Sequence, residues 1–301
     1  MTHGSAALLT STVLACVGAA ITIDAQRSSR PSESRTREVY VSVVDNAGKP
    51  VTGLTAADFA VREEGTAREI LKAGPATEPM TIAIGVDDSE ASRQYIQFLR
   101  DALNGFVKKL DGKAQIALTT FGERPTVLVD YTDSTATLQK GIQRIFARQG
   151  GGAYLLEALV ELSQGLQRRE NAARKAIVII TVEAGPEFSN LFSKNVLDAL
   201  KRGGATLHVL ALGTPSPSDA DEMRNRNIAI AEGTALTGGR RDQVLGESGL
   251  SDRLAQLADE LINQYVVSYS RPESLIPPEK LDVSVTKPGL TVRAPKRASG
   301  K

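Results

Sequence analysis

The side chains best suited to chemistry stand together at one point of the chain, directly after an apolar run. Residues 81–87 are almost continuously apolar, and residues 87–92 read Asp-Asp-Ser-Glu-Ala-Ser. Carboxylate and hydroxyl oxygens of this kind are the ligands that Mg²⁺ prefers in proteins. Asp and Ser are also the usual residues at a helix N-terminus, where their side chains accept hydrogen bonds from free backbone N–H groups. On its own the pattern leaves two interpretations open, a metal site and a helix cap.

Nucleophilic and metal-binding side chains are scarce elsewhere. The 301 residues include one cysteine, Cys16, and two histidines, His3 and His208. Cys16 and His3 fall in an expected leader, so the mature chain would keep His208 alone, which removes disulfide frameworks, cysteine nucleophiles and Cys/His zinc sites. A Ser-His-Asp triad would have to use His208, whose place in a strand pattern favours a packed core histidine. The motifs GxxxxGK[ST] and GxSxG do not occur. We therefore expect a protein that is not an enzyme.

Composition and charge exclude several other classes. The chain is 41% hydrophobic and 24% charged, which is typical of globular domains and not of disordered chains. Lys and Arg number 36 against 35 Asp and Glu, so no net field attracts nucleic acid or an anionic membrane. We expect neither nucleic acid nor, beyond an export leader, a membrane among its partners.

The N-terminal residues have the pattern of an export signal. Residues 6–23 form an uncharged apolar run, and the small residue Ala25 suits cleavage by signal peptidase directly after it. We predict a signal peptide over residues 1–25, a linker over residues 26–36 and a secreted or periplasmic mature protein. No Lys or Arg precedes the run, so an uncleaved anchor stays open, because about 18 apolar residues span a bilayer. Lipidation at Cys16 is a third alternative.

The middle of the chain, residues 79–264, alternates between strand and helix patterns. Alternation of this kind predicts an α/β fold with a doubly wound, mostly parallel sheet and helices on both faces. Ligands of such sheets bind at the carboxyl ends of the strands, which is where residues 87–92 would lie. The strands are expected at 81–87, 114–121, 125–131, 176–182 and 205–213, and the helices at 96–110 and around 135–147, 154–168, 194–202 and 250–264.

Shorter alternating strands flank this region on both sides. They fall in residues 37–75 and again in residues 265–295, separated by turn-forming Gly and Pro. We expect the two segments to pair into one small β domain beside the α/β domain, although two separate β units would give the same pattern. Residues 296–301 are expected to be a frayed tail.

Three stretches of the α/β region carry a resemblance to a known family. IAIGVDDSEAS, IALTTFG and GGGAYLLEAL resemble, in order and spacing, a von Willebrand factor A domain. The flanking stretches VSVVDNAGKPVTGLTAADFAVREEG, LTGGR and QYVVSYS are similar to an exported bacterial subgroup, so that the resemblance covers most of residues 38–294. It implies a Rossmann-like fold, a protein-binding function and a metal-ion-dependent adhesion site. That site uses Asp-x-Ser-x-Ser, a Thr and an Asp.

Transferred to this sequence, the adhesion site is incomplete. Asp87 and Ser89 match the first two ligand positions. Ala91, Ala153 and Val182 replace the other expected ligands, and none of these side chains has an oxygen. The resemblance therefore implies a degenerate site in which Mg²⁺ would be weakly held.

Neighbouring residues offer substitute oxygens. A register shifted by one residue would use Asp88, Glu90 and Ser92, and Glu183 stands one residue after the missing Asp. Neither register restores the Thr. A working Mg²⁺ site in the shifted register stays an alternative. The residues expected to form the binding site are Asp87, Ser89, Glu90, Ser92, Ala153 and Glu183.

These observations favour an exported, non-enzymatic protein–protein interaction or adhesion module that works without a cofactor. Its partner would be an unidentified protein or an envelope or extracellular ligand, contacted through the loops at the carboxyl ends of the strands. The alternatives are the same module with a working Mg²⁺ site, a periplasmic hydrolase that uses His208, and a structural role in an envelope assembly.

Overall fold

The computed structural model describes residues 34–296 except 170, 216–219, 247–248 and 273–278. The predicted signal peptide, most of the predicted linker and all but the first residue of the predicted tail lie outside the described residues. Strand β1 (Ser34–Val44) includes the last three residues of the segment that we expected to be a linker, because they pair there with strand β11 (Tyr265–Pro272). None of the helices in the described ranges has the length and apolar character needed to span a bilayer.

A six-stranded sheet forms the centre of the α/β domain, in the order β10-β9-β8-β5-β6-β7. All neighbouring strands are parallel except β7, which runs antiparallel to β6 at the edge. The predicted doubly wound, mostly parallel sheet is therefore confirmed. The strands are β5 (Met80–Val86), β6 (Ala114–Thr120), β7 (Thr126–Thr132), β8 (Arg174–Val182), β9 (Thr206–Leu212) and β10 (Arg241–Val244).

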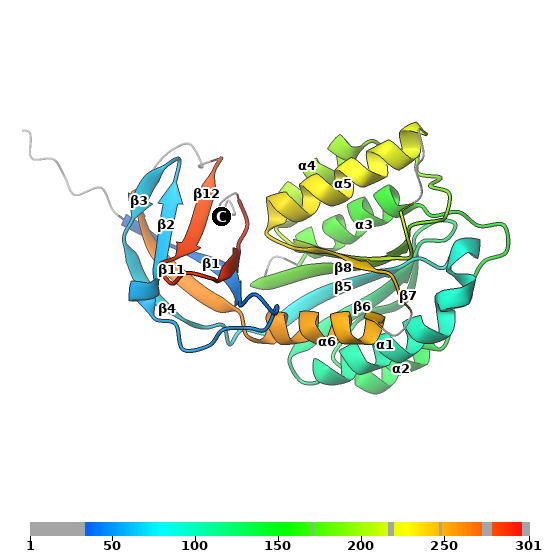
Figure 1. The fold of residues 1–301 in the computed structure, drawn as a ribbon, viewed down its shortest axis with the longest axis horizontal. Coiled ribbons are helices and arrows are strands. Elements are labelled where there is room, and N and C mark those ends of the chain that lie inside the picture. Colours follow the sequence, from blue (N-terminus) through cyan, green and yellow to red (C-terminus); the bar gives the residue numbers. More distant parts are fainter. Residues whose placement is uncertain (1–33, 170, 216–219, 247–248, 273–278, 297–301) are drawn as a thin grey trace, which may run out of the picture. The chain divides into compact units, whose positions relative to one another are not determined.

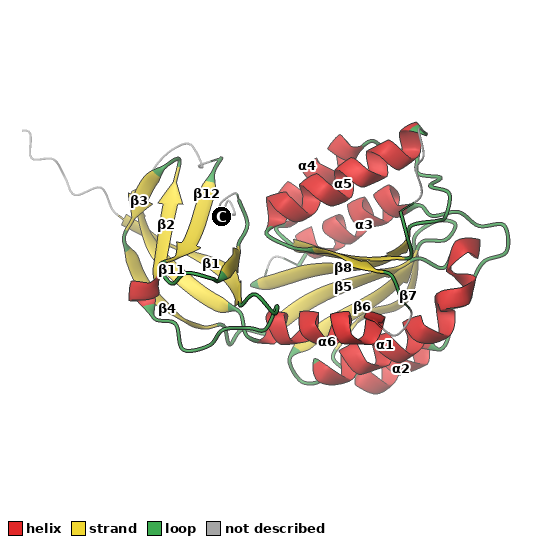
Figure 2. Ribbon diagram, viewed as in Figure 1, coloured by secondary structure: helices red, strands yellow, loops and turns green. Residues whose placement is uncertain are grey.

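Helices cover both faces of this sheet (Figures 1 and 2). One face carries α1 (Ile96–Lys109), α2 (Thr135–Ile142) and α6 (Gly249–Ile262), and the other carries α3 (Leu155–Gln167), α4 (Ser193–Gly203) and α5 (Asp221–Thr237).

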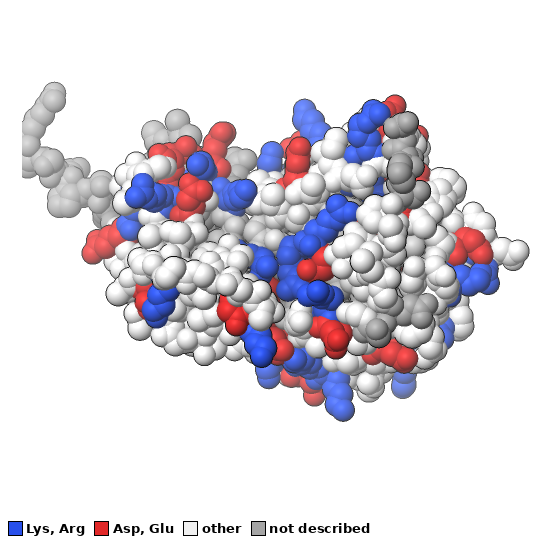
Figure 3. Space-filling view, in the orientation of Figure 1, with Lys and Arg blue, Asp and Glu red and all other residues white. Residues whose placement is uncertain are grey.

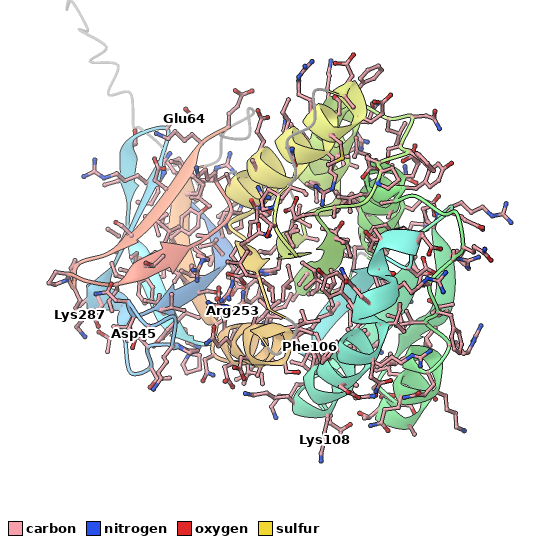
Figure 4. All side chains as sticks on the ribbon, turned by 45° about the vertical axis from the view of Figure 1, so that its right-hand side comes forward. Asp45, Glu64, Phe106, Lys108, Arg253 and Lys287 are labelled. Atoms are coloured by element: carbon pink, nitrogen blue, oxygen red, sulfur yellow. The ribbon has the colours of Figure 1, made fainter. Side chains whose placement is uncertain are left out.

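Strand β5 shows why the central strands are apolar throughout. Ile82 and Ile84 belong to the buried cluster on the α1 and α6 side, whereas Ala83 belongs to the cluster on the α3 and α4 side. Helix α1 has one buried face: Phe106 is buried in the core, while Lys108 extends away from the helix (Figure 4). A strand buried on both faces gives a continuous apolar run, and a helix buried on one face gives apolar residues three and four positions apart.

The flanking segments form two small antiparallel sheets, as expected from their alternating patterns. One sheet has the order β13-β1-β11-β4 and the other β12-β2-β3. Strand β1 pairs with β11 from Ser34↔Pro272 to Val41↔Tyr265, which confirms that the N- and C-terminal segments pair. The remaining elements are the 3₁₀ helix Ala56–Asp58, β2 (Phe59–Glu63), β3 (Thr66–Arg68), β4 (Ile70–Pro75), β12 (Leu281–Val285) and β13 (Thr291–Arg293).

A buried carboxylate lies inside this β domain. The side chain of Glu63 is fully buried and accepts a hydrogen bond from the hydroxyl of Tyr269 at 2.9 Å. Arg68 Nε lies 3.0 Å and Arg271 Nε 3.5 Å from Glu63 Oε2. Paired in this way, a buried charge is tolerated in a core that is otherwise apolar.

Candidate functional site

Asp87, the residue directly after β5, ties the ends of two central strands together. Its side chain is 1% exposed. Oδ1 accepts a hydrogen bond from Ser89 N at 3.0 Å, and Oδ2 accepts hydrogen bonds from Val182 N at 3.1 Å and Thr181 Oγ1 at 3.3 Å. Both carboxylate oxygens are therefore occupied by protein donors.

In Asp88, the first residue of the shifted register, both carboxylate oxygens likewise accept hydrogen bonds from protein donors. Its Oδ1 accepts a hydrogen bond from Gly122 N at 2.5 Å, and its Oδ2 accepts one from Arg148 Nε at 3.0 Å. The backbone carbonyl of Asp88 accepts a further hydrogen bond from Arg148 N at 2.8 Å. Asp88 thus holds together the loops that follow β6 and α2.

The next residues form a 3₁₀ helix, Glu90–Tyr95, in which Ser92 alone is buried. Ser89 is its N-terminal cap residue, but its side chain makes no capping hydrogen bond, and its buried hydroxyl has no hydrogen-bond partner among the described residues. Ser92 Oγ is also buried and donates to Ser89 O at 2.7 Å. Glu90 is exposed, and hydrogen bonds from Arg93 at 2.7 and 2.8 Å hold the pKa of its carboxyl below the usual range.

The loop after β8 covers this region. Ala153 is buried, donates its N–H to Pro186 O at 2.9 Å and accepts a hydrogen bond from Phe188 N at 2.7 Å. A Cβ atom at Gly185 would lie 2.9 Å from Ala91 Cβ and 3.7 Å from Ser89 Oγ. Since only the absence of a side chain permits this approach, Gly185 closes the loop over the second and third ligand positions of the expected adhesion site, Ser89 and Ala91.

Glu183, the proposed substitute acid, is buried between two arginines. Its Oε1 accepts a hydrogen bond from Arg241 Nη2 at 2.8 Å, and its Oε2 accepts one from Arg226 Nη1 at 3.2 Å. Arg226 lies on α5 with its side chain 2% exposed, and its Nη2 donates to Thr181 Oγ1 and to Val182 O, both at 3.3 Å.

A further buried acid, Glu187, completes this group. Its Oε1 accepts hydrogen bonds from Leu155 N at 3.0 Å and Ser189 N at 3.3 Å, and its Oε2 lies 3.8 Å from Arg226 Nε. Burial raises the pKa of Glu187 to about 7, against the opposing effect of these hydrogen bonds and of Arg226. We call Asp87, Thr181, Glu183, Glu187, Arg226 and Arg241 the Arg226 cluster.

The sequence indicated only part of this cluster. Asp87 and Glu183 stand at recognisable positions after two strands, whereas Glu187 and Arg226 match no motif. The signal that could have found Arg226 is indirect: buried acids without a metal ion need a cation from another part of the chain.

With Arg226 and the other protein donors in place, the acidic side chains do not fit a divalent cation. Ala91 and Ala153 have no side-chain oxygen, and Val182 offers only its backbone, whose carbonyl accepts from Arg226. Asp87, Asp88 and Glu183 direct their carboxylate oxygens at N–H and O–H donors of the protein. Within the described ranges no three His, Cys, Asp or Glu side chains are placed to hold a metal ion.

His208 does not form a catalytic triad among the described residues. It lies within β9, is 1% exposed, and both ring nitrogens lack a hydrogen-bond partner in the described part of the chain. Burial lowers its pKa to about 4. A triad needs an imidazole hydrogen-bonded to a serine and an acid, so this geometry gives no support to the hydrolase alternative.

Exposed aromatic residues flank the covered site. Phe188 is 45% exposed and Phe192, at the start of α4, is 66% exposed. The ring of Phe188 contacts Tyr154 edge-on, with the ring centroids 6.1 Å apart. Exposed aromatic side chains can bury a large apolar area against a partner.

Comparison with known proteins identifies the domain. The family model described as von Willebrand factor type A domain matches residues 82–183. Proximal thread matrix protein 1 from the mussel byssus, solved with a zinc-occupied MIDAS motif, has a TM-score of 0.50 and 15% identity, and the match covers 66% of this chain and 49% of that one.

Two bacterial structures match with lower TM-scores. For von Willebrand factor type A from Catenulispora acidiphila the TM-score is 0.49 at 12% identity, covering 87% of this chain and 72% of that chain. For BatB from Bacteroides thetaiotaomicron the TM-score is 0.45 at 15% identity, and the match covers 60% of this chain and 98% of that chain. No curated protein matches the chain. Residues 82–183 of this chain therefore match the von Willebrand factor type A family, as the motifs predicted.

Proposed function

We propose that the protein is an exported, non-enzymatic interaction module that binds a protein or an envelope or extracellular ligand without a metal ion. Domains of this family mediate protein–protein interaction and adhesion. The observation that carries metal independence is the hydrogen bonding of Asp87 and Glu183, whose oxygens already accept from protein donors. Export rests on the leader pattern of residues 6–23 and Ala25.

The partner contacts the exposed residues around the covered site. Of the six residues expected to form the site, Glu90 is exposed to about 43% of its side chain, whereas the other five are buried and shape the loops. We define the contact surface as Glu90, Phe188 and Phe192. Aromatic side chains are frequent anchors of protein interfaces because they bury a large apolar area on binding.

Charge supports a partner recognised by shape and apolar contact. Both basic and acidic side chains lie on the face visible in Figure 3, where basic ones gather near the middle of the view. The whole chain has a formal net charge of +1, which provides little long-range steering, so short-range contacts decide affinity.

Affinity capture from the envelope fraction of the native cell tests the proposal. The ligand should be retained equally in EDTA and in Mg²⁺, and it should be lost when Phe188 and Phe192 are both replaced by Asp. Leu71→Asp is the matched control, because Leu71 is 50% exposed on β4 of the β domain. Capture that requires Mg²⁺, or that survives the double substitution, contradicts the proposal.

One observation favours the second candidate, a module with a working Mg²⁺ site. The hydroxyls of Ser89 and Thr120 are both buried and have no hydrogen-bond partner among the described residues. Buried hydroxyls are normally satisfied, so a bound water or ion would account for them. Cation titration of the folded protein separates the two candidates.

A further inference from the structure

Among the described residues, Arg226 has the largest side chain that is fully buried. A guanidinium is always charged, and removing it from water is costly unless carboxylates pair with it. Its burial therefore requires an explanation from the groups that surround it.

Those groups lie at the end of β8 and in the loop after it. Arg226 Nη1 donates to Glu183 Oε2 at 3.2 Å, Nη2 donates to Val182 O at 3.3 Å, and Nε lies 3.8 Å from Glu187 Oε2. Val182 stands at the position where the family motif has its Asp ligand.

The guanidinium also reaches the first ligand position through one hydroxyl. Arg226 Nη2 donates to Thr181 Oγ1 at 3.3 Å, and Thr181 Oγ1 donates to Asp87 Oδ2 at 3.3 Å. Three buried carboxyl groups thus lie against one guanidinium, either directly or through this hydroxyl.

We propose that Arg226 is a built-in cation: it supplies, at the ends of β5 and β8, the positive charge that a bound metal ion supplies in complete adhesion sites. This deepens the proposed metal-independent function and rests on it. A covalently attached cation cannot dissociate, so the loops around the contact surface keep one arrangement at any concentration of divalent cation.

Cation complementation of an arginine-free variant tests this role. In Arg226→Ala the melting temperature should fall in EDTA, and saturating Mn²⁺ should raise it by about 5–10 °C, the shift given by a ligand at about a hundred times its dissociation constant. The wild-type protein should show no such rise. Adding Glu183→Gln to Arg226→Ala should abolish the rescue.

Arg174→Ala is the matched control. Arg174 is also a buried arginine, but its partners are neutral oxygens: Nη1 donates to Glu78 O and Nη2 to Gln264 Oε1, both at 3.1 Å. Its loss should lower the melting temperature without any rescue by Mn²⁺.

Each outcome decides the assignment of Arg226. Folded Arg226→Ala that gains nothing from Mn²⁺, or equal rescue of Arg174→Ala, overturns it. If Arg226→Ala does not fold in EDTA, refolding in Mn²⁺ should restore the near-ultraviolet circular dichroism signal, and failure to restore it also overturns the role. Failure of the proposed function is seen separately, as capture of the wild-type ligand that requires Mg²⁺.

Discussion

Replacing Asp87 with alanine should destabilise the protein by about 3–5 kcal/mol, in EDTA as well as in Mg²⁺. The carboxylate accepts hydrogen bonds from Ser89 N at 3.0 Å and Val182 N at 3.1 Å, and a longer one from Thr181 Oγ1 at 3.3 Å. A hydrogen bond to a charged group contributes about 1.5–3 kcal/mol, so the two backbone bonds account for most of the loss. The substitution also leaves buried N–H groups without an acceptor.

Urea unfolding followed by circular dichroism measures this loss. Asp87→Asn keeps one acceptor oxygen, so its free energy of unfolding should fall by about half as much as that of the alanine variant. Asp101→Ala is the control, because Asp101 is exposed on α1 and its removal should change the free energy of unfolding by less than about 0.5 kcal/mol. A loss below about 1 kcal/mol in EDTA that grows in Mg²⁺ would refute the reasoning, since Asp87 would then act as a metal ligand.

Three further substitutions test the buried groups, all by urea unfolding. His208 has a folded pKa of about 4 against an ordinary value of 6.5, so its contribution is present above pH 6.5 and is lost as the pH falls towards 4. Between pH 7 and pH 4.5, the free energy of unfolding of His208→Leu should therefore fall by about 2–3 kcal/mol less than that of the wild type. An equal fall in both proteins would contradict this. Gly122→Ala should cost about 3 kcal/mol, because its Cβ would lie 2.4 Å from backbone atoms of the loop after β5, whereas Gly105→Ala, with open space, should be tolerated. Tyr269→Phe should cost about 1–3 kcal/mol by removing the donor to buried Glu63, and a neutral effect would show that Glu63 is solvated.

The sequence predicted the α/β architecture because the central strands are buried on both faces and therefore apolar throughout. Helix α5 was not predicted. Its buried face includes Arg226, Thr234 and Thr237, so no apolar periodicity marks it. The strands β3, β4 and β10 are three to six residues long, too short for an alternating pattern to separate them from loops.

The candidate site was predictable only where it follows strand ends. Asp87 and Glu183 could be placed because parallel strands end at the same edge of the sheet. Burial could not be foreseen: the closure by Gly185 depends on the path of a loop. The pairing of Arg226 with Glu183 joins residues 43 positions apart, and no local pattern encodes such a contact.

We propose above all that this protein binds its partner without a metal ion. Thermal unfolding of the wild-type protein in EDTA, in 10 mM Mg²⁺ and in 10 mM Mn²⁺ tests it most directly. We predict the same melting temperature in all three conditions, to within about 1 °C. A rise of about 5–10 °C with either cation, lost in Asp87→Ala, would contradict the claim.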